Sequence, residues 1–169
     1  MNKAIFLDRD GVINIDKAYV VKIEDFEFSP HIFDVLDYLQ HLDYKLIIVT
    51  NQSGIARGYY SEKDFETLTE WMVKQFTKKG IKIEAIYHCP HKPEDHCLCR
   101  KPSPKMLEDA MNDYDIDPQK SWMIGDKPSD IEASLNAGIS QTIFVNNTIC
   151  DKAKYNAKTI FDIISIIKK

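Results

Sequence analysis

Short apolar runs alternate with amphipathic segments along the chain. The apolar runs predict buried strands, which fall at residues 4–7, 45–50, 83–87, 122–125 and 142–145. Between them, apolar residues recur at the spacing of one helix face, which predicts helices over residues 32–42, 62–79, 104–114, 129–137 and 159–167. Strands that alternate with helices favour an α/β fold, here a three-layer, doubly wound parallel sheet with helices on both faces.

The helix predicted over residues 62–79 has recognisable ends. Ser61 precedes it, and Asp64 follows three residues later, which makes an approximate capping box. Gly80 comes directly after it, as is common where helices stop.

Composition and charge narrow the class of protein. The chain has 169 residues, 44% hydrophobic and 28% charged, which suits one globular domain over residues 1–169. A net charge of −4 without a Lys/Arg block disfavours a nucleic-acid partner. No apolar run approaches the roughly 20 residues of a membrane span, and Asp8 interrupts the N-terminal run too early for a signal peptide. We therefore expect a cytoplasmic monomer without membrane contact.

Polar residues follow several predicted strands directly. In parallel sheets, ligands bind beyond the carboxyl ends of the strands, near the switch in strand order. Any one of these residues alone would be an ordinary turn or loop residue. Together they are typical of phosphate chemistry, and they are Asp8, Asp10, Thr50, Asn51, Asp126 and, within the loop after the third strand, Lys101.

These motifs, in this order, resemble the haloacid dehalogenase superfamily. The resemblance extends from Ile5 to about Gly138. Within the superfamily, the chain is most similar to a group of small phosphatases that act on histidinol phosphate or on a heptose bisphosphate. The motifs that carry the resemblance are Asp8-Arg9-Asp10-Gly11, Thr50-Asn51, Lys101-Pro102 and Gly125-Asp126-Lys127-Pro128-Ser129-Asp130.

The resemblance implies a magnesium-dependent phosphoric monoester hydrolase with an aspartyl-phosphate intermediate. Asp8 would be the nucleophile. Asp10 would protonate the leaving oxygen and then take a proton from the hydrolytic water. Thr50 and Lys101 would bind the phosphoryl group during transfer.

The resemblance also implies a catalytic Mg²⁺. Its ligands would be Asp8, the backbone carbonyl of Asp10, and Asp126, which are the hard oxygen donors that this ion prefers. The role of Asp130 remains open between alternatives. It is either a carboxylate stabilised in the first turn of a helix, or a group that orients Lys101 or a metal-bound water.

A cysteine and histidine cluster occupies the loop over residues 88–103. Cys89, His91, Cys97 and Cys99 place four sulfur and nitrogen ligands within eleven residues. Three thiolates and one imidazole suit a closed, tetrahedral zinc site, and the spacing resembles the zinc loop of the phosphatase group. Because such a site has no open position, we expect a structural Zn²⁺ rather than a catalytic one.

The zinc loop leads directly into Arg100 and Lys101. A bound zinc ion would therefore hold both cations near the phosphate, which is preorganisation. His88 and His96 flank the cluster but lie outside the Cys-x-His pattern, and Cys150 is expected to be an ordinary thiol.

The segment Thr50–Gly58 resembles the branch of the group that acts on a heptose bisphosphate. The implied reaction removes the 7-phosphate and leaves heptose 1-phosphate, in nucleotide-heptose and lipopolysaccharide precursor synthesis. Arg100 or Arg57 would pair with the second phosphate, at carbon 1. The absence of long insertions implies an open site without a large cap domain. By the same resemblance the substrate is contacted by Asp16, Lys17, Ala18, Tyr19, Thr50, Asn51, Gln52, Ser53, Arg57, Arg100 and Lys101.

Three other functions remain open from the sequence. Five residues separate His91 from Cys97, a length also seen in histidinol phosphatase, so histidinol phosphate remains an alternative substrate. A non-catalytic receiver domain shares the sheet topology and an acidic pocket, but it has no counterpart to Asp10 or to the zinc loop. A nucleic-acid 3′-phosphatase uses similar motifs, and the acidic charge disfavours it.

Overall fold

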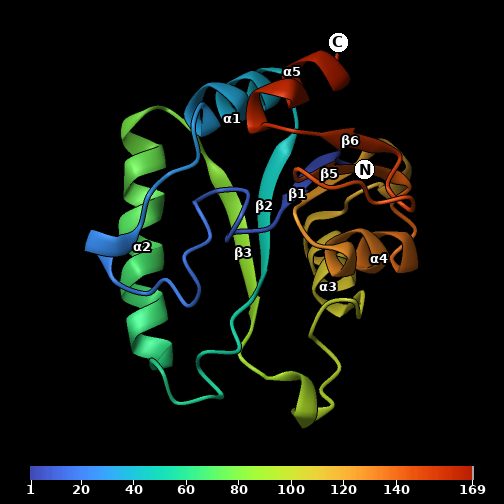
Figure 1. Ribbon diagram of the computed structural model, residues 1–169. Coiled ribbons are helices and arrows are strands. Elements are labelled where there is room, and N and C mark those ends of the chain that lie inside the picture. Colours follow the sequence, from blue (N-terminus) through green and yellow to red (C-terminus); the bar gives the residue numbers. More distant parts are fainter. Residues whose placement is uncertain (169) are drawn as a thin grey trace.

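The computed structural model describes residues 1–168 and contains one parallel sheet (Figure 1). The strands pair in parallel throughout, in the order β3-β2-β1-β4-β5-β6. The predicted doubly wound α/β fold is confirmed. The strands are β1 (Ala4–Leu7), β2 (Lys45–Asn51), β3 (Ile83–Cys89), β4 (Trp122–Gly125), β5 (Gln141–Val145) and β6 (Tyr155–Ala157).

Helices cover both faces of the sheet, which makes the three expected layers. Alternate side chains of β1 separate into two cores: Ile5 and Leu7 pack beneath α1, α2 and α5, whereas Ala4 and Phe6 pack beneath α3 and α4. This two-sided burial explains why β1 reads as an unbroken apolar run. The helices are α1 (Ile32–His41), α2 (Glu62–Lys78), α3 (Lys105–Tyr114), α4 (Pro128–Asn136) and α5 (Ile163–Ile166).

The strand order reverses between β1 and β4. Chain segments before α3 build the sheet outward from β1 in one direction, and later segments build it in the other. The loops that follow β1 and β4 therefore diverge and leave a crevice at their carboxyl ends. Asp8 and Asp10 after β1, and Lys127 and Ser129 after β4, line a cavity there.

The capping box of α2 forms as predicted. The Ser61 hydroxyl accepts a hydrogen bond from the Asp64 N–H at 3.1 Å, and the Asp64 carboxylate accepts one from the Ser61 N–H at 2.8 Å. The helix ends before Gly80, whose φ of 75° lies in the left-handed region.

The C-terminal part differs from the sequence prediction. The strand β6 was not predicted, because it is short and Tyr155 and Asn156 are exposed, so no apolar run marks it. The helix predicted over residues 159–167 is wrong in length: a 3₁₀ turn at Ile160–Asp162 leads into the single turn of α5.

The connections from β1 to α1 and from β3 to α3 hold only short 3₁₀ turns, Ile23–Asp25 and Pro93–Asp95. Among residues 1–168 these connections thus contain no separate cap domain. No helix in this range has both the length and the apolar character required to cross a membrane.

Candidate active site

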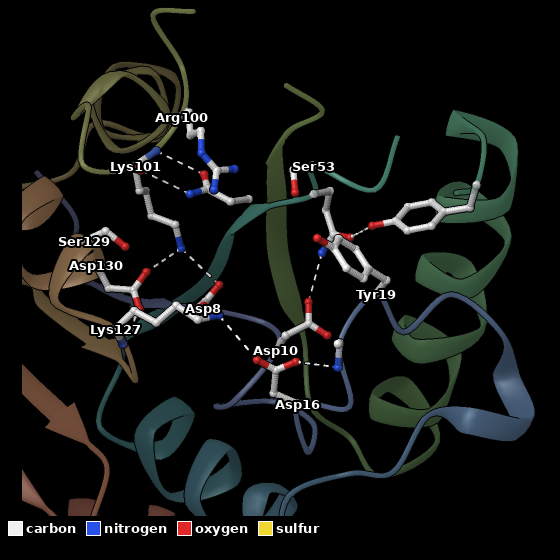
Figure 2. Close-up of a pocket in the computed structure, with 14 residues that line it drawn as sticks. Asp8, Asp10, Asp16, Tyr19, Ser53, Arg100, Lys101, Lys127, Ser129 and Asp130 are labelled. Carbon is white, nitrogen blue, oxygen red and sulfur yellow. Dashed lines mark hydrogen bonds and ion pairs between the residues drawn. The ribbon is translucent and has the colours of Figure 1, made fainter. Parts of the chain in front are cut away.

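A polar cavity of about 290 Å³ lies at the carboxyl ends of β1 and β2, beside the start of α4 (Figure 2). Segments far apart in sequence contribute to it, as expected at the switch in strand order. Its walls carry both carboxylates and cationic side chains. The lining residues are Asp8, Asp10, Asp16, Ala18, Tyr19, Asn51, Gln52, Ser53, Tyr60, Arg100, Lys101, Lys127, Ser129 and Asp130.

A buried lysine lies between two aspartates at the base of the cavity. The Lys101 Nζ is 3.0 Å from Asp8 Oδ1 and 2.7 Å from Asp130 Oδ1, and it also donates to the Val49 carbonyl at 2.8 Å. Burial lowers the pKa of Lys101, but the charges of Asp130 and Asp8 outweigh it and raise that pKa above its ordinary value. Lys101 is therefore a fixed cation beside Asp8 (Figure 2).

Asp130 is committed to contacts within the protein. Its Oδ2 accepts hydrogen bonds from the N–H groups of Asp126 and Lys127, at 3.1 and 3.0 Å, while Oδ1 accepts from Lys101. A Cβ on Gly125 would overlap the Asp130 side chain, so glycine permits this close approach. The contacts agree with two of the interpretations from the sequence: Asp130 accepts hydrogen bonds at the first turn of α4, and it pairs with Lys101.

The acidic cluster (Asp8, Asp126 and Asp130) has the character of a divalent-cation site. Oxygen atoms of the three carboxylates lie within 4.8 Å of one another, and Asp126 Oδ1 is buried without a hydrogen-bond partner. Burial and the Asp130 charge raise the pKa of Asp8, while burial and the Asp8 charge raise the pKa of Asp126 to about 8. A hard cation relieves this repulsion. These residues fit Mg²⁺.

Asp10 lies in an environment that stabilises its charged form, in contrast to Asp8 and Asp126. Its carboxylate accepts hydrogen bonds from Arg9 Nε and Nη2 at 3.1 and 3.0 Å, from Asn14 Nδ2 at 3.0 Å and from Gln52 Nε2 at 3.1 Å. Burial pushes the pKa of Asp10 upward, but the Arg9 charge and these hydrogen bonds hold it below its ordinary value. Without a ligand in the cavity, Asp10 is therefore a carboxylate.

A loop at the mouth of the cavity has an unusual backbone. Ala18 and Tyr19 both have positive φ, 57° and 54°. Asp16 holds the loop, since its Oδ1 accepts from the Ala18 N–H at 3.0 Å and its Oδ2 lies 3.4 Å from Lys127 Nζ. The Tyr19 ring contacts Tyr59 edge-on, with centroids 4.8 Å apart. Strain of this kind is concentrated where proteins bind ligands.

Several predicted site residues do not line the cavity. Thr50 lies beneath it, 1% exposed, and accepts from Gln52 Nε2 at 2.9 Å. Lys17 pairs with Glu27 at 2.9 Å, and Arg57 lies on the exposed surface with Ser53 Oγ at 3.4 Å. The other predicted substrate contacts line it together. They are Asp16, Ala18, Tyr19, Asn51, Gln52, Ser53, Arg100 and Lys101.

The structure adds residues to which sequence reasoning gave no role. Lys127 and Ser129 lie in the motif after β4, but only the fold shows that they face the cavity. Tyr60 lines it as well and donates to Gln52 Oε1 at 2.5 Å. A Cβ on Gly54 would overlap the Tyr60 ring, which is the one local signal that this loop is tightly packed.

The Cys/His cluster (Cys89, His91, Cys97 and Cys99) converges in space. Sulfur and nitrogen atoms are separated by 3.4 to 3.8 Å in four of its contacts, and the Cys89 and Cys99 sulfurs by 2.6 Å. Zinc–sulfur bonds of about 2.3 Å give a tetrahedron with edges of about 3.8 Å. Except for the short edge, the donor set fits Zn²⁺.

The other cysteine and histidines near that loop have separate surroundings. His88 pairs with Glu62 at 2.7 Å. His96 is exposed, and Cys150 is buried in a small apolar cluster of its own.

Hydrogen bonds connect the Cys/His cluster to the cavity. The Arg100 side chain donates to the His91 carbonyl at 3.2 Å. The Lys101 N–H donates to Asn51 Oδ1 at 3.0 Å, and Asn51 Nδ2 donates back to the Lys101 carbonyl at 3.2 Å. The backbone that carries both cations is therefore fixed from two sides.

The fold and this site define a haloacid dehalogenase-like hydrolase. Residues 98–164 match the Hydrolase_like family model, described as HAD-hydrolase-like. A crystal structure of D,D-heptose 1,7-bisphosphate phosphatase from B. bronchiseptica, complexed with magnesium and phosphate, is similar with a TM-score of 0.86 and 29% identity. The similarity covers 95% of each chain.

Two curated relatives show to which family of these hydrolases the chain belongs. D-glycero-alpha-D-manno-heptose-1,7-bisphosphate 7-phosphatase of Campylobacter jejuni is 56% identical over 85% of this chain and 83% of that protein. The corresponding beta-named phosphatase of Pasteurella multocida is 43% identical over 100% of this chain and 96% of that protein. The chain belongs to the heptose-1,7-bisphosphate 7-phosphatase family of phosphoric monoester hydrolases.

Proposed function

We propose that the enzyme removes the 7-phosphate of D-glycero-D-manno-heptose 1,7-bisphosphate and leaves heptose 1-phosphate. Three cationic side chains line the cavity, Lys101, Arg100 and Lys127, and the observation that carries this proposal is the placement of the first two at separate positions in it. Lys101 lies at its base beside Asp8, and Arg100 lies on its wall. A substrate with two phosphates engages both, whereas histidinol phosphate uses only one. The names of the relatives support the same substrate and do not favour a receiver domain.

Asp8 is the proposed nucleophile. It attacks phosphorus, an oxygen–phosphorus bond forms, and the ester bond to the sugar oxygen breaks. Asp10 gives its proton to that oxygen, so the product leaves as an alcohol. The Lys101 ammonium and the Thr50 hydroxyl stabilise the phosphoryl oxygens during transfer.

In the second step, hydrolysis of the aspartyl phosphate, Asp10 acts as a general base. It takes a proton from a water molecule, which attacks phosphorus, releases inorganic phosphate and restores Asp8. The low pKa of Asp10 in the free enzyme suits this second role. For the first role it needs a proton, and the negative phosphate bound beside it raises its pKa by like-charge repulsion.

The proposed Mg²⁺ ligands are Asp8, the backbone carbonyl of Asp10, and Asp126. The unpartnered Asp126 Oδ1 supports this assignment, and so does a packing contact, because a Cβ on Gly11 would overlap the Asp126 carboxylate. The ion would supply positive charge to the phosphoryl oxygens.

The proposed Zn²⁺ ligands are the four members of the Cys/His cluster. This ion has a structural role in the proposal: it holds the loop over residues 88–103 and, through it, Arg100 and Lys101. We assign the second phosphate to Arg100 rather than Arg57, because Arg100 lines the cavity and Arg57 does not.

Residues 1–169 are proposed to form one domain that works as a cytoplasmic monomer, without nucleic-acid or membrane partners. The single sheet and the charge of −4 support this proposal. Light scattering during size-exclusion chromatography measures the mass in solution, and a dimer would contradict it.

The substrate is tested by phosphorus NMR of both anomers of heptose 1,7-bisphosphate, with histidinol phosphate measured alongside. Both anomers are needed because alpha- and beta-named relatives are similar to this chain. We expect the carbon-7 ester signal to disappear while the carbon-1 ester remains. Loss of the carbon-1 ester, or faster release from histidinol phosphate, would contradict the proposal.

A further inference from the structure

Arg9 is a fully buried arginine at the edge of the active site. Its exposed fraction is 2%, and it does not line the cavity. Its guanidinium lies between two aromatic rings, 6.0 Å from the Phe26 centroid and 5.9 Å from the Phe65 centroid. Burial of an arginine is costly unless it is fully paired, so its partners indicate its role.

The side chain of Arg9 has two partners. Nε and Nη2 pair with the two oxygens of the Asp10 carboxylate, at 3.1 and 3.0 Å, which is a bidentate fork. Nη2 also donates to the Val20 carbonyl at 2.7 Å, directly after the loop that contains Ala18 and Tyr19. One guanidinium thus joins the acid/base residue to the loop at the mouth of the cavity.

The turn after β1 does not depend on the Arg9 side chain. That turn is held by the Arg9 backbone carbonyl, which accepts hydrogen bonds from the N–H groups of Val12, Ile13 and Asn14. Any residue at position 9 supplies this carbonyl. The side chain is therefore free to serve a purpose other than the local fold.

We propose that Arg9 is a positioning residue that fixes the plane of the Asp10 carboxylate for proton transfer to the leaving oxygen. This rests on the acid/base role assigned to Asp10 in the proposed function. Proton transfer requires close alignment, and a misplacement of about 1 Å costs ~10²-fold in rate. Arg9 does not line the cavity, so it acts through the groups that it holds, and its effect on proton transfer is assigned to Asp10.

Arg9→Lys is the sharpest variant, because it keeps the charge and loses the fork. We expect kcat for the sugar bisphosphate to fall by about 10²-fold with little change in KM. For p-nitrophenyl phosphate, whose leaving group needs little protonation, the fall is expected to be less than about tenfold. Arg9→Met, which fills the space between the rings without any charge, should show the same difference between substrates.

Phe76→Leu is the matched control for lost stability. Phe76 is fully buried in the core and belongs to no part of the site. Thermal unfolding of each variant measures its stability. If the control, at equal or greater loss of stability, shows the same difference between the two substrates, Arg9 has only a structural role.

A double mutant tests whether the effect of Arg9 on kcat depends on Asp10. If Arg9 works through Asp10, then adding Arg9→Lys to Asp10→Asn lowers kcat by less than about threefold further. Independent, multiplying losses would overturn the proposal, and so would equal losses on both substrates. The comparison needs only some alkyl phosphate that the wild type hydrolyses, so it stands even if heptose bisphosphate is not the substrate.

Discussion

The acidic cluster and the Cys/His cluster are both groups of side chains that fit a metal ion, and they are built in different ways. The acidic cluster consists of oxygen donors from the residues directly after β1 and β4, two adjacent strands in the middle of the sheet, and from the first turn of α4. The Cys/His cluster consists mainly of sulfur donors on a loop that leaves β3, an edge strand. The first is held by the core of the fold, whereas the second is proposed to give order to a loop of which only the cysteines pack in or against the core.

The two clusters are expected to have different roles: the acidic cluster takes part in the reaction, and the Cys/His cluster supports the groups that assist it. Asp8 and Lys101 meet at 3.0 Å in a nearly dry environment, where charge acts strongly on a reacting phosphate. The Cys/His cluster reaches the same place indirectly, through the backbone of residues 100 and 101, the Arg100 side chain and the Cys89 carbonyl, which accepts from the Gln52 N–H at 2.7 Å. We therefore expect damage to the first cluster to remove the reaction itself, and damage to the second to misplace the groups that assist it.

The largest effect is expected from Asp8→Asn, which should abolish phosphate release. An amide has nearly the shape of the carboxylate but is a very poor nucleophile. Thermal unfolding should show a folded protein, and phosphate release measures turnover. Asp37→Asn, on the exposed face of α1, is the matched control and should retain full activity. Stable Asp8→Asn protein with more than a few per cent of wild-type activity would exclude Asp8 as the nucleophile.

Removal of the metal ions should separate the two clusters. A weak chelator should abolish activity by removing Mg²⁺, and added Mg²⁺ should restore it, because hard oxygen ligands exchange this ion readily. Zinc should remain at close to one ion per chain throughout, as elemental analysis would count. Activity that survives without Mg²⁺, or a purified active protein without zinc, would contradict the assignment of the ions.

The two clusters also differ in how well the sequence predicts them. The four members of the Cys/His cluster lie within eleven residues, so their spacing alone indicates a metal site. Asp8 and Asp126 are far apart in sequence but directly follow buried strands, so the parallel topology brings them together. Neither signal exists for Tyr60, and the positions of Arg9 and Lys127 directly after β1 and β4 do not show what their side chains contact. Their roles depend on side-chain directions and on packing between loops, which local patterns do not encode.

Cys99→Ser should have an intermediate effect. The sheet should remain intact, because Cys89 is the one member of the cluster that lies on a strand, and secondary structure by circular dichroism should change little. Activity should fall by about 10²-fold, since a misplaced Lys101 no longer meets the phosphate. The double mutant with Lys101→Ala should lose much less than the two losses multiplied. Normal activity of Cys99→Ser would mean that the cluster does not support the site.

The smallest effects are expected at the wall of the cavity. Arg100→Ala should raise KM for the bisphosphate about tenfold, because a charge-assisted hydrogen bond to the second phosphate is lost. Arg57→Ala should change KM by less than about twofold, since Arg57 lies outside the cavity. Steady-state kinetics on the bisphosphate and on a monophosphate compare the two. A larger effect at Arg57 would reverse the assignment of the second phosphate.

The central claim is that Asp8 becomes phosphorylated during turnover. The most direct test is to quench the working enzyme in acid within milliseconds and reduce the trapped acyl phosphate with borohydride. That reduction converts the modified aspartate to homoserine, which mass spectrometry of the peptides locates. The account predicts homoserine at position 8, and none in the Asp8→Asn variant. Homoserine at position 10, or at no position while phosphate is released, would contradict it.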